Sequence, residues 1–244
     1  MGDQEEFFEE KLKNIKKMGL TRELRELAVE FIEKSGKYRY SYNFEWLGLP
    51  IIQFPQDIVA IQEIIWSSKP DLIIETGVAR GGSLILSASI LELIGGNGEV
   101  LGIDVDIRNH NRKAIESHTL NRRIQLLEGS SVDSEVIRQV SEMAATKNRI
   151  MVMLDSMHTH DHVYKELVNY SQFVSKECYL IVFDTSIEFM PENYFPNRPW
   201  KKGDNPKTAV DQFLELYDDF VVDEEINNKL LISTAQRGYL KRIK

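Results

Sequence analysis

Hydrophobic residues are distributed in two alternating patterns from residue 71 onward. Short runs such as 150–154 and 180–183 are apolar at successive positions, which is typical of strands buried on both faces of a sheet. Between them, apolar residues recur every three or four positions, as in amphipathic helices. We predict strands at 71–75, 99–104, 123–128, 149–155, 178–184, 219–224 and 229–235, and helices at 82–94, 110–118, 133–145, 161–175 and 206–218.

This alternation predicts an α/β fold with a doubly wound, mostly parallel, seven-stranded Rossmann-like sheet. Only a short polar link, 225–228, separates the last two predicted strands. We therefore expect those two strands to pair antiparallel as a C-terminal hairpin.

The first 54 residues have a different pattern. Residues 4–34 read as one or two charged amphipathic helices with a break near Gly19. Aromatic and polar residues then alternate over 38–46, which indicates either a short exposed strand or an aromatic flap over a pocket. A helix with Pro55 near its first position follows. We expect 1–54 to form an extension that serves as a lid or an interface in a homo-oligomer, and 55–244 to form the main domain.

Charge and composition exclude several classes of protein. The 244 residues contain 30 Lys and Arg against 38 Asp and Glu, a net charge of −8, which disfavours nucleic-acid binding. One cysteine, Cys178, fits a reducing compartment. The first ten residues are acidic and have no apolar core, so we expect no secretory signal. No apolar run reaches transmembrane length, and we expect a cytoplasmic protein.

A glycine-rich turn follows the first predicted strand of the main domain. The segment Glu75-Thr-Gly-Val-Ala-Arg-Gly-Gly-Ser83 leads from that strand into a helix, where glycine lets a ligand approach the backbone. A plain connection without a ligand is the alternative. A P-loop needs lysine where Ser83 stands, and a dinucleotide-binding turn needs glycine where Ala79 stands. Both of these ligands are therefore rejected.

S-adenosylmethionine, which carries no phosphate, is the remaining candidate. Asp104 ends the next strand, where an acid can bind ribose hydroxyls, and Asp106 is a weaker substitute. Ser130 and Ser131 follow the third strand, where the adenine would lie, although Ser131 or Asp133 could instead only cap the next helix. The predicted cofactor residues are Glu75, Thr76, Gly77, Arg80, Gly81, Gly82, Ser83, Asp104, Ser130 and Ser131.

Two aspartates end neighbouring predicted strands and suggest a metal site. Neighbouring strands lie about 4.8 Å apart, so Asp155 and Asp184 can share one hard cation such as Mg²⁺. His158 could then act as the base that takes a proton from an acceptor hydroxyl. Turn or helix capping is the alternative for both aspartates. The zinc-hydrolase pattern H-x-H-x-D-H is one residue longer than the segment 158–162, and we reject it.

Six segments together resemble the cephalosporin hydroxylase family. They are Trp46-Leu-Gly48, Glu75 to Ser83, Leu154-Asp-Ser-Met-His-Thr-His160, Arg198-Pro-Trp200, Asn205-Pro-Lys-Thr-Ala209 and Gly238-Tyr-Leu-Lys241. The resemblance covers the chain from about residue 40 to its end. It implies the class I methyltransferase fold, S-adenosylmethionine, a divalent metal held by Asp155 and Asp184, and His158 as base. The family is related to metal-dependent sugar O-methyltransferases, including rhamnosyl and macrolide-sugar enzymes.

One position departs from the family pattern. The family has an acid immediately before the strand-five aspartate, where this chain has Phe183, and Glu188 is a possible replacement. The sequence predicts an O-methyltransferase that acts on a sugar or other small hydroxylated acceptor of a cell-surface polysaccharide or secondary metabolite. The alternatives are a cofactor-binding relative without methyl transfer, or a hydroxylase of the cephalosporin type. The long loop 190–205 is a candidate lid, in which Tyr194, Phe195, Arg198 and Trp200 could contact the acceptor.

Overall fold

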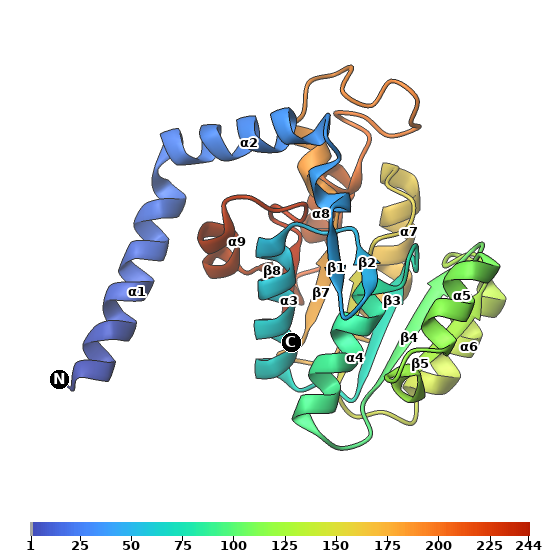
Figure 1. Cartoon of the computed structure of the whole chain (residues 1–244). Coiled ribbons are helices and arrows are strands. Elements are labelled where there is room, and N and C mark those ends of the chain that lie inside the picture. The colour runs from blue at the N-terminus through green and yellow to red at the C-terminus, as the bar shows by residue number, and fades with distance from the viewer. Residues whose placement is uncertain (1) are drawn as a thin grey trace.

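A seven-stranded mixed sheet forms the centre of the molecule. The structure is a computed structural model and describes residues 2–244. The strand order is β5-β4-β3-β6-β7-β9-β8 (Figure 1). The parallel strands are β3 (Leu72–Thr76), β4 (Glu99–Asp104), β5 (Ile124–Glu128), β6 (Ile150–Leu154) and β7 (Tyr179–Val182), and the antiparallel strands are β8 (Phe220–Val222) and β9 (Tyr239–Arg242).

Helices cover both faces of this sheet, as the apolar strands predicted. One face packs on α3 (Pro55–Ser68), α4 (Gly82–Ile94) and α5 (Asn109–Glu116); the other packs on α6 (Ser134–Ala144), α7 (His160–Ser171) and α8 (Pro206–Leu216). Successive strand residues serve opposite faces: Ile73 packs with α3 and α4, whereas Leu72 and Ile74 pack with α6 and α7. The predicted doubly wound α/β fold is confirmed.

The C-terminal antiparallel pair is present, but the predicted position of its second strand is wrong. Residues 224–230 form helix α9 (Glu224–Leu230), and the strand that pairs with β8 is β9 instead of 229–235. The reason is local. The side chain of Asp223 accepts hydrogen bonds from the backbone N–H groups of Glu225 and Ile226 and so caps a helix where a polar link was predicted.

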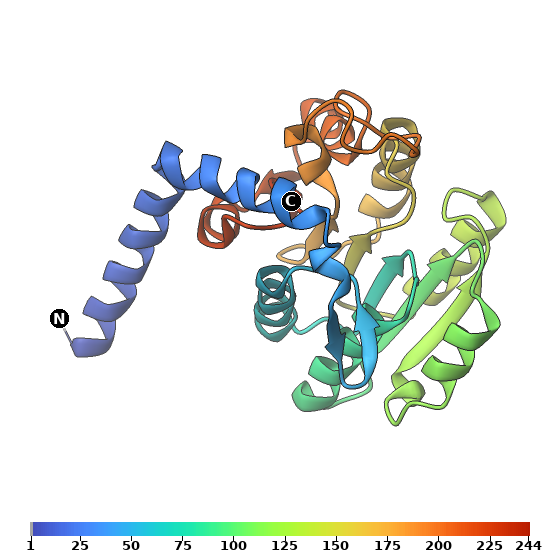
Figure 2. The same cartoon turned by 45° about the horizontal axis from the view of Figure 1, so that its top comes forward.

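The N-terminal segment consists of an arm and a hairpin. Helices α1 (Asp3–Leu20) and α2 (Arg22–Gly36) project from the domain, and α1 contacts the rest of the chain mainly through α9 (Figures 1 and 2). The predicted break near Gly19 is confirmed. The aromatic segment forms a 3-10 turn (Tyr40–Tyr42) and a hairpin of β1 (Phe44–Trp46) and β2 (Leu49–Ile51).

Two further 3-10 turns, η2 (Asn121–Arg123) and η3 (Thr185–Phe189), connect elements of the domain. Within residues 2–244, no helix combines the length and the apolar character that crossing a membrane requires.

Candidate cofactor and metal site

The glycine turn lies between β3 and α4 and is held in a conformation that other residues rarely adopt. Gly77 and Gly81 have φ angles of 94° and 85°. A Cβ atom on Gly77 would lie 2.0 Å from the backbone oxygen of Asp155, so the turn packs directly against the end of β6. Gly82 begins α4, and a Cβ atom there would lie 2.3 Å from the carbonyl oxygen of Pro50. The turn is therefore enclosed between the hairpin and the sheet.

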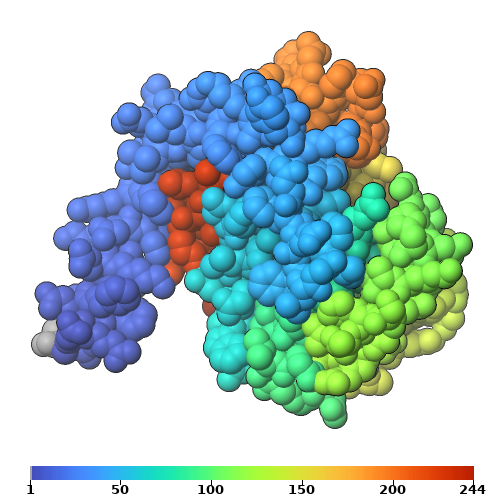
Figure 3. Space-filling view, in the orientation of Figure 1, coloured from blue at the N-terminus to red at the C-terminus, as the bar shows by residue number. Residues whose placement is uncertain are grey.

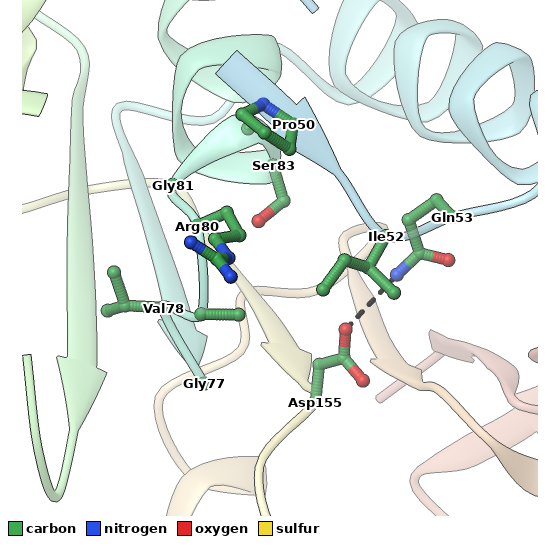
Figure 4. Close-up of a pocket in the computed structure, with 11 residues that line it drawn as sticks. Pro50, Ile52, Gln53, Gly77, Val78, Arg80, Gly81, Ser83 and Asp155 are labelled. Atoms are coloured by element: carbon green, nitrogen blue, oxygen red, sulfur yellow. Dashed lines mark hydrogen bonds between the residues drawn. The ribbon is translucent and has the colours of Figure 1, made fainter. Parts of the chain in front are cut away.

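A small hollow that is open to solvent lies at this turn (Figure 4). It is lined by the glycine turn, by the second strand of the hairpin with the segment that follows it, and by the first acid after β6. These residues are Gly77 to Ser83, Pro50, Ile52, Gln53 and Asp155. The N-terminal extension thus contributes one wall of the hollow. Trp46 fastens the hairpin to α4 by donating a hydrogen bond from Nε1 to Oγ of Ser89 at 3.0 Å.

Glu75 lies buried beneath the glycine turn, next to Ser83. The Ser83 hydroxyl donates a hydrogen bond to Oε1, while Oε2 has no hydrogen-bond partner among residues 2–244. Burial raises the pKa of Glu75 to about 8, which the bond from Ser83 only partly opposes. The carboxyl group is therefore mostly protonated at neutral pH. The neighbouring Thr76 is also buried, and its hydroxyl oxygen has no partner in the described part of the chain.

Asp104 ends β4 and lies against the same turn. Its Oδ2 accepts hydrogen bonds from the backbone N–H groups of Val78 (2.9 Å) and Ala79 (3.3 Å). Asp106, the weaker candidate, is exposed; it donates its backbone N–H to Asp104 at 3.2 Å, and its carboxylate lies 3.9 Å from Nε of Arg108. The structure therefore brings the acid at position 104 to the turn, as the spacing predicted.

The other predicted cofactor residues are more dispersed. Arg80 is exposed and approaches Nε2 of His110 at 3.3 Å. Ser131 is buried, with its hydroxyl 3.2 Å from Nε2 of His162, and Ser130 accepts a turn hydrogen bond from the backbone of Asp133. The cap of α6 is Asp133 itself, whose side chain accepts from Glu135. Ser131 therefore does not cap α6.

Three side chains converge where β6 and β7 leave the sheet. One ligand atom each from Asp155, His158 and Asp184 lies within 4.8 Å of the others, and residues 2–244 contain no other such group of three. Nε2 of His158 is 3.0 Å from Oδ2 of Asp184. Asp184 has a left-handed backbone with φ of 55°, a strained conformation for a residue with a side chain.

The charges at this cluster suit a cation. Burial raises the pKa of Asp155 well above its usual range, and the nearby carboxylate of Asp184 raises it further. A divalent ion between two such carboxylates would offset their repulsion, and oxygen donors are those that Mg²⁺ prefers. The residues present therefore fit a hard divalent cation.

Glu188 and Phe183 do not extend the cluster. Oε2 of Glu188 accepts hydrogen bonds from the backbone of Gly203 (2.9 Å) and the side-chain amide of Asn205 (2.6 Å), so it fixes the loop before α8. Phe183 is buried in the apolar core. The suggestion that Glu188 replaces the missing acid of the family pattern has no support in this arrangement.

The loop 190–205 reaches the cluster through one aromatic side chain. The ring of Trp200 lies edge-on to His158 with a centroid distance of 4.7 Å, and the Arg198 guanidinium lies 5.1 Å from the Trp200 centroid. Tyr194 and Phe195 instead pack towards α2, where the Tyr194 hydroxyl donates to the carbonyl oxygen of Glu33 at 2.9 Å. They anchor the loop to the N-terminal arm, and so they are not free to bind an acceptor.

The other two histidines of the cluster 158–162 have structural partners. His160 begins α7 and bonds through its two ring nitrogens to Thr208 and Gln212 on α8, each at 2.8 Å. His162 approaches Ser131, Ser156 and the buried Glu166. Both rings therefore have hydrogen-bonding partners within the fold and lie outside the group of possible metal ligands.

Sequence reasoning missed a buried hydrogen-bond chain behind Asp155. Gln53 donates from Nε2 to Oδ2 of Asp155 and accepts at Oε1 from the Thr234 hydroxyl, both at 3.1 Å. Thr234, Ser233 and Tyr239 all donate to the fully buried Asp57 on α3. Burial raises the pKa of Asp57, and these hydrogen bonds oppose the rise. In the sequence, the one sign of this chain was that Asp57 lies on the apolar face of the helix predicted after Pro55.

Comparison with known proteins identifies the family of the chain. The sequence matches the Rhamnosyl O-methyltransferase/CmcI family over residues 38–243. It is 28% identical over 218 residues to the rhamnosyl O-methyltransferase of Mycobacterium tuberculosis (strain H37Rv), which covers 86% of this chain and 84% of that protein. The enzyme of the same description from Mycobacterium leprae (strain TN) is 25% identical over 199 residues, with coverage of 81% and 82%.

Two solved structures share the fold. A structure of CmcI with Mg and SAM superposes with a TM-score of 0.59 at 20% identity, covering 83% of this chain and 78% of that one. An O-methyltransferase from Bacillus cereus in complex with SAH has a TM-score of 0.53 at 14% identity, with 92% of each chain covered. At these identities the likeness establishes the architecture of the sheet and its helices.

Proposed function

Because the chain belongs to the Rhamnosyl O-methyltransferase/CmcI family of SAM-dependent O-methyltransferases, we propose that it methylates a hydroxyl group of a sugar or other small hydroxylated acceptor, assisted by a divalent cation such as Mg²⁺. The observation that carries this proposal is the adjacency of two sites. The glycine turn touches the backbone of Asp155, and the Asp155 side chain belongs to the cluster with His158 and Asp184. A methyl donor on the turn would therefore lie beside the groups that handle the acceptor.

The turn has the features that a sulfonium donor requires. The free N–H groups at the start of α4 and the glycine backbone can bind the carboxylate of the methionine part. Glu75, which has one carboxyl oxygen without a hydrogen-bond partner, would lie near the positively charged groups of the bound donor. Asp104 is placed to accept from ribose hydroxyls, and Ser130 and Ser131 lie at the end of β5 for the adenine. Thr76, Arg80 and Ser83 complete the predicted contacts.

The cluster has the features that a hydroxyl acceptor requires. When bound between Asp155 and Asp184, a divalent cation supplies positive charge that makes a nearby hydroxyl easier to deprotonate. His158 holds one ring nitrogen towards Asp184 at 3.0 Å, which fixes the ring and leaves the other nitrogen to accept the hydroxyl proton. The acceptor oxygen then bonds to the methyl carbon as the carbon–sulfur bond breaks, and the sulfonium becomes a neutral thioether.

A sugar is the proposed acceptor class, as part of a cell-surface polysaccharide or a secondary metabolite. The names of the rhamnosyl O-methyltransferase relatives support it. Trp200 lies beside His158 and offers an apolar ring face of the kind on which sugars stack, while Arg198 next to it could bind an anionic group. We further propose that residues 1–54 act as an extension that closes the hollow, and that the enzyme works in the cytoplasm, where a single buried thiol stays reduced.

Calorimetry and turnover test this function together. S-adenosylmethionine should bind the full chain, and Mg²⁺ should be required for methyl transfer from labelled donor to a panel of rhamnosides and other glycosides. Asp155→Ala should abolish turnover while an unchanged circular dichroism spectrum shows that the protein is folded. Lack of donor binding would refute the proposal, and full activity of the variant would refute the metal role.

A second candidate is a relative that binds the donor without transferring its methyl group. Phe183, in place of the acid of the family pattern, favours it, because one carboxylate is missing beside Asp184. Donor binding with no turnover on any acceptor, with or without Mg²⁺, would select this candidate. A hydroxylase is less favoured, since the cluster lacks the two histidines and one carboxylate that hold iron in non-haem oxygenases.

A further inference from the structure

The loop that carries Trp200 is fastened to helix α2 by one tyrosine. The Tyr194 hydroxyl donates a hydrogen bond to the carbonyl oxygen of Glu33 at 2.9 Å and lies 3.4 Å from that of Ile32. Glu33 is in the last turn of α2, where carbonyl groups have no partner within the helix. Figures 1 and 3 show the loop, in orange, against α2 in blue. The loop 190–205 and the N-terminal arm are therefore in direct contact.

Gly36, the last residue of α2, leaves the space that this contact needs. A Cβ atom at Gly36 would lie 1.7 Å from the hydroxyl oxygen of Tyr194 and 2.9 Å from the ring carbon that carries it. The backbone does not require glycine here, because Gly36 is helical and its φ lies outside the left-handed region. Glycine in a helix is in fact less stable than alanine. The close approach of Tyr194 therefore accounts for the glycine.

A small apolar cluster surrounds this hydrogen bond. Tyr194 and Phe195 lie edge to face with their ring centroids 4.7 Å apart, and both pack against the buried side chains of Ile32, Phe54 and Met190. Ile32 and Phe54 belong to the N-terminal extension, whereas Met190 is the first residue of the loop. The cluster therefore joins the extension to the loop through apolar contacts as well as through the hydroxyl group.

Trp200 lies between this attachment and a second one on the main domain. On the domain side, the carboxylate of Asp204 accepts a hydrogen bond from the backbone N–H of His160, at the start of α7, at 2.9 Å. On the arm side, Tyr194 and Phe195 are the side chains that hold the loop. The place of Trp200 is thus set from both ends of the loop, and only one end is attached to the domain that carries the metal cluster.

We propose that Tyr194 is a positioning residue for the acceptor, because its contact with α2 holds the loop so that Trp200 stays edge-on to His158 at 4.7 Å. This inference rests on the proposed function, in which Trp200 contacts a sugar beside His158. Helix α2 then shapes the acceptor side of the site without touching the acceptor. The alternative is that Tyr194 only caps α2. A cap needs the hydroxyl alone, whereas the apolar cluster also fixes the start of the loop.

Fluorine NMR on the full chain reports the surroundings of Trp200 without any turnover. The chain has three tryptophans, Trp46, Trp66 and Trp200, so 5-fluorotryptophan gives three resonances, each assigned from its phenylalanine variant. Tyr194→Phe should shift or broaden the Trp200 resonance and leave that of Trp66 unchanged. Tyr38→Phe, at a ring of the same extension that is 70% exposed, is the matched control and should leave all three unchanged. An unchanged Trp200 resonance in Tyr194→Phe would overturn the proposal.

Gly36→Ala tests the same contact from the side of the helix. The added methyl group displaces the Tyr194 hydroxyl and should shift the Trp200 resonance in the same way as Tyr194→Phe. In the double variant Gly36→Ala/Tyr194→Phe the clashing hydroxyl is absent, so the methyl group should add little further shift. Gly2→Ala, with no atom within 4 Å of its Cβ position, is the control. Shifts that simply add in the double variant would show that the two residues act independently and contradict the proposal.

Steady-state kinetics test the consequence for the acceptor. With Mg²⁺ and a rhamnoside, Tyr194→Phe should raise the acceptor KM about three- to tenfold, the effect of losing one hydrogen bond, and leave kcat nearly unchanged. Donor affinity by calorimetry should stay the same, because Tyr194 does not line the hollow. An unchanged KM, or a weakened donor affinity, would overturn the role in acceptor positioning. If no glycoside is methylated by the wild type, the proposed function fails, and the fluorine resonances still decide whether Tyr194 positions Trp200.

Discussion

Gln53 donates a hydrogen bond from Nε2 to Oδ2 of Asp155 across 3.1 Å (Figure 4). Its other amide atom accepts from Thr234, so both ends of the amide are held. The carboxylate proposed to bind the metal is therefore oriented by a residue of the N-terminal extension.

Gln53→Ala should weaken metal binding. Loss of a residue that orients a metal ligand typically costs about ten- to a hundredfold in metal affinity. Titration with Mn²⁺, followed by electron paramagnetic resonance, measures that affinity independently of turnover. Gln62→Ala on α3 is the control, and equal affinities for the two variants would remove the orienting role from Gln53.

Gly77→Ala should destabilise the protein and abolish methyl-donor binding. The new Cβ would lie 2.0 Å from the backbone oxygen of Asp155, in addition to the cost of a left-handed backbone, about 1–2 kcal/mol. Gly48 has a similar φ of 89° and no atom within 4 Å of its Cβ position. Gly48→Ala should therefore show the backbone cost alone in urea denaturation. Equal losses of unfolding free energy would contradict the close packing at Gly77.

Binding of S-adenosylmethionine should release protons at neutral pH. The pKa of Glu75 is about 8 in the free protein, and the positive charges of the donor favour the ionised carboxylate and lower that pKa. Calorimetry in two buffers of different ionisation enthalpy measures the number of protons released. Glu75→Gln should bind without this release; identical proton release by the variant would place its source elsewhere.

The same carboxyl group should make stability depend on pH. Its pKa rises from an ordinary 4.5 to about 8 on folding, so its contribution is fully present below about 4.5 and is lost as the pH rises through about 8. As the pH rises between these values, the unfolding free energy of Glu75→Gln should therefore increase relative to that of the wild type. Urea denaturation across this pH range would show a constant difference if Glu75 titrated normally.

Trp200→Ala should raise the KM for the acceptor and leave donor affinity unchanged, because Trp200 contacts His158 and does not line the hollow at the glycine turn. Steady-state kinetics and donor calorimetry separate the two effects. Lys202→Ala, at an exposed position of the same loop, is the control. A weakened donor affinity in Trp200→Ala would show that the loop serves the cofactor instead.

The main helices and strands could be predicted from the periodicity of apolar residues, because glycine and polar residues mark where each one begins and ends. Helix α4 and strand β4 have the predicted bounds, 82–94 and 99–104. The C-terminal strand was misplaced because residues 230–232 are apolar and suggest a strand, whereas the cap at Asp223 starts a helix. Local hydrogen bonds of this kind outweigh a short apolar run.

The site was predictable where strands end and hidden where it depends on distant contacts. Asp104, Asp155 and Asp184 follow strands, so the topology brings them to one edge. Gln53 has no such position, and its contact with Asp155 joins residues 102 apart in the sequence. A periodic pattern of apolar residues gives no information about a contact between residues so far apart in the sequence.

The hydrogen bonds of Asp57 tie the candidate site to the C-terminal part of the chain. Its partners Ser233, Thr234 and Tyr239 follow it by 176 to 182 residues, and Thr234 is also the residue that holds Gln53. During synthesis, Asp57, Gln53 and Asp155 all leave the ribosome before those partners exist. A nascent chain that ends before residue 233 therefore lacks the hydrogen bonds that hold Gln53 and Asp57, and with them the support behind Asp155.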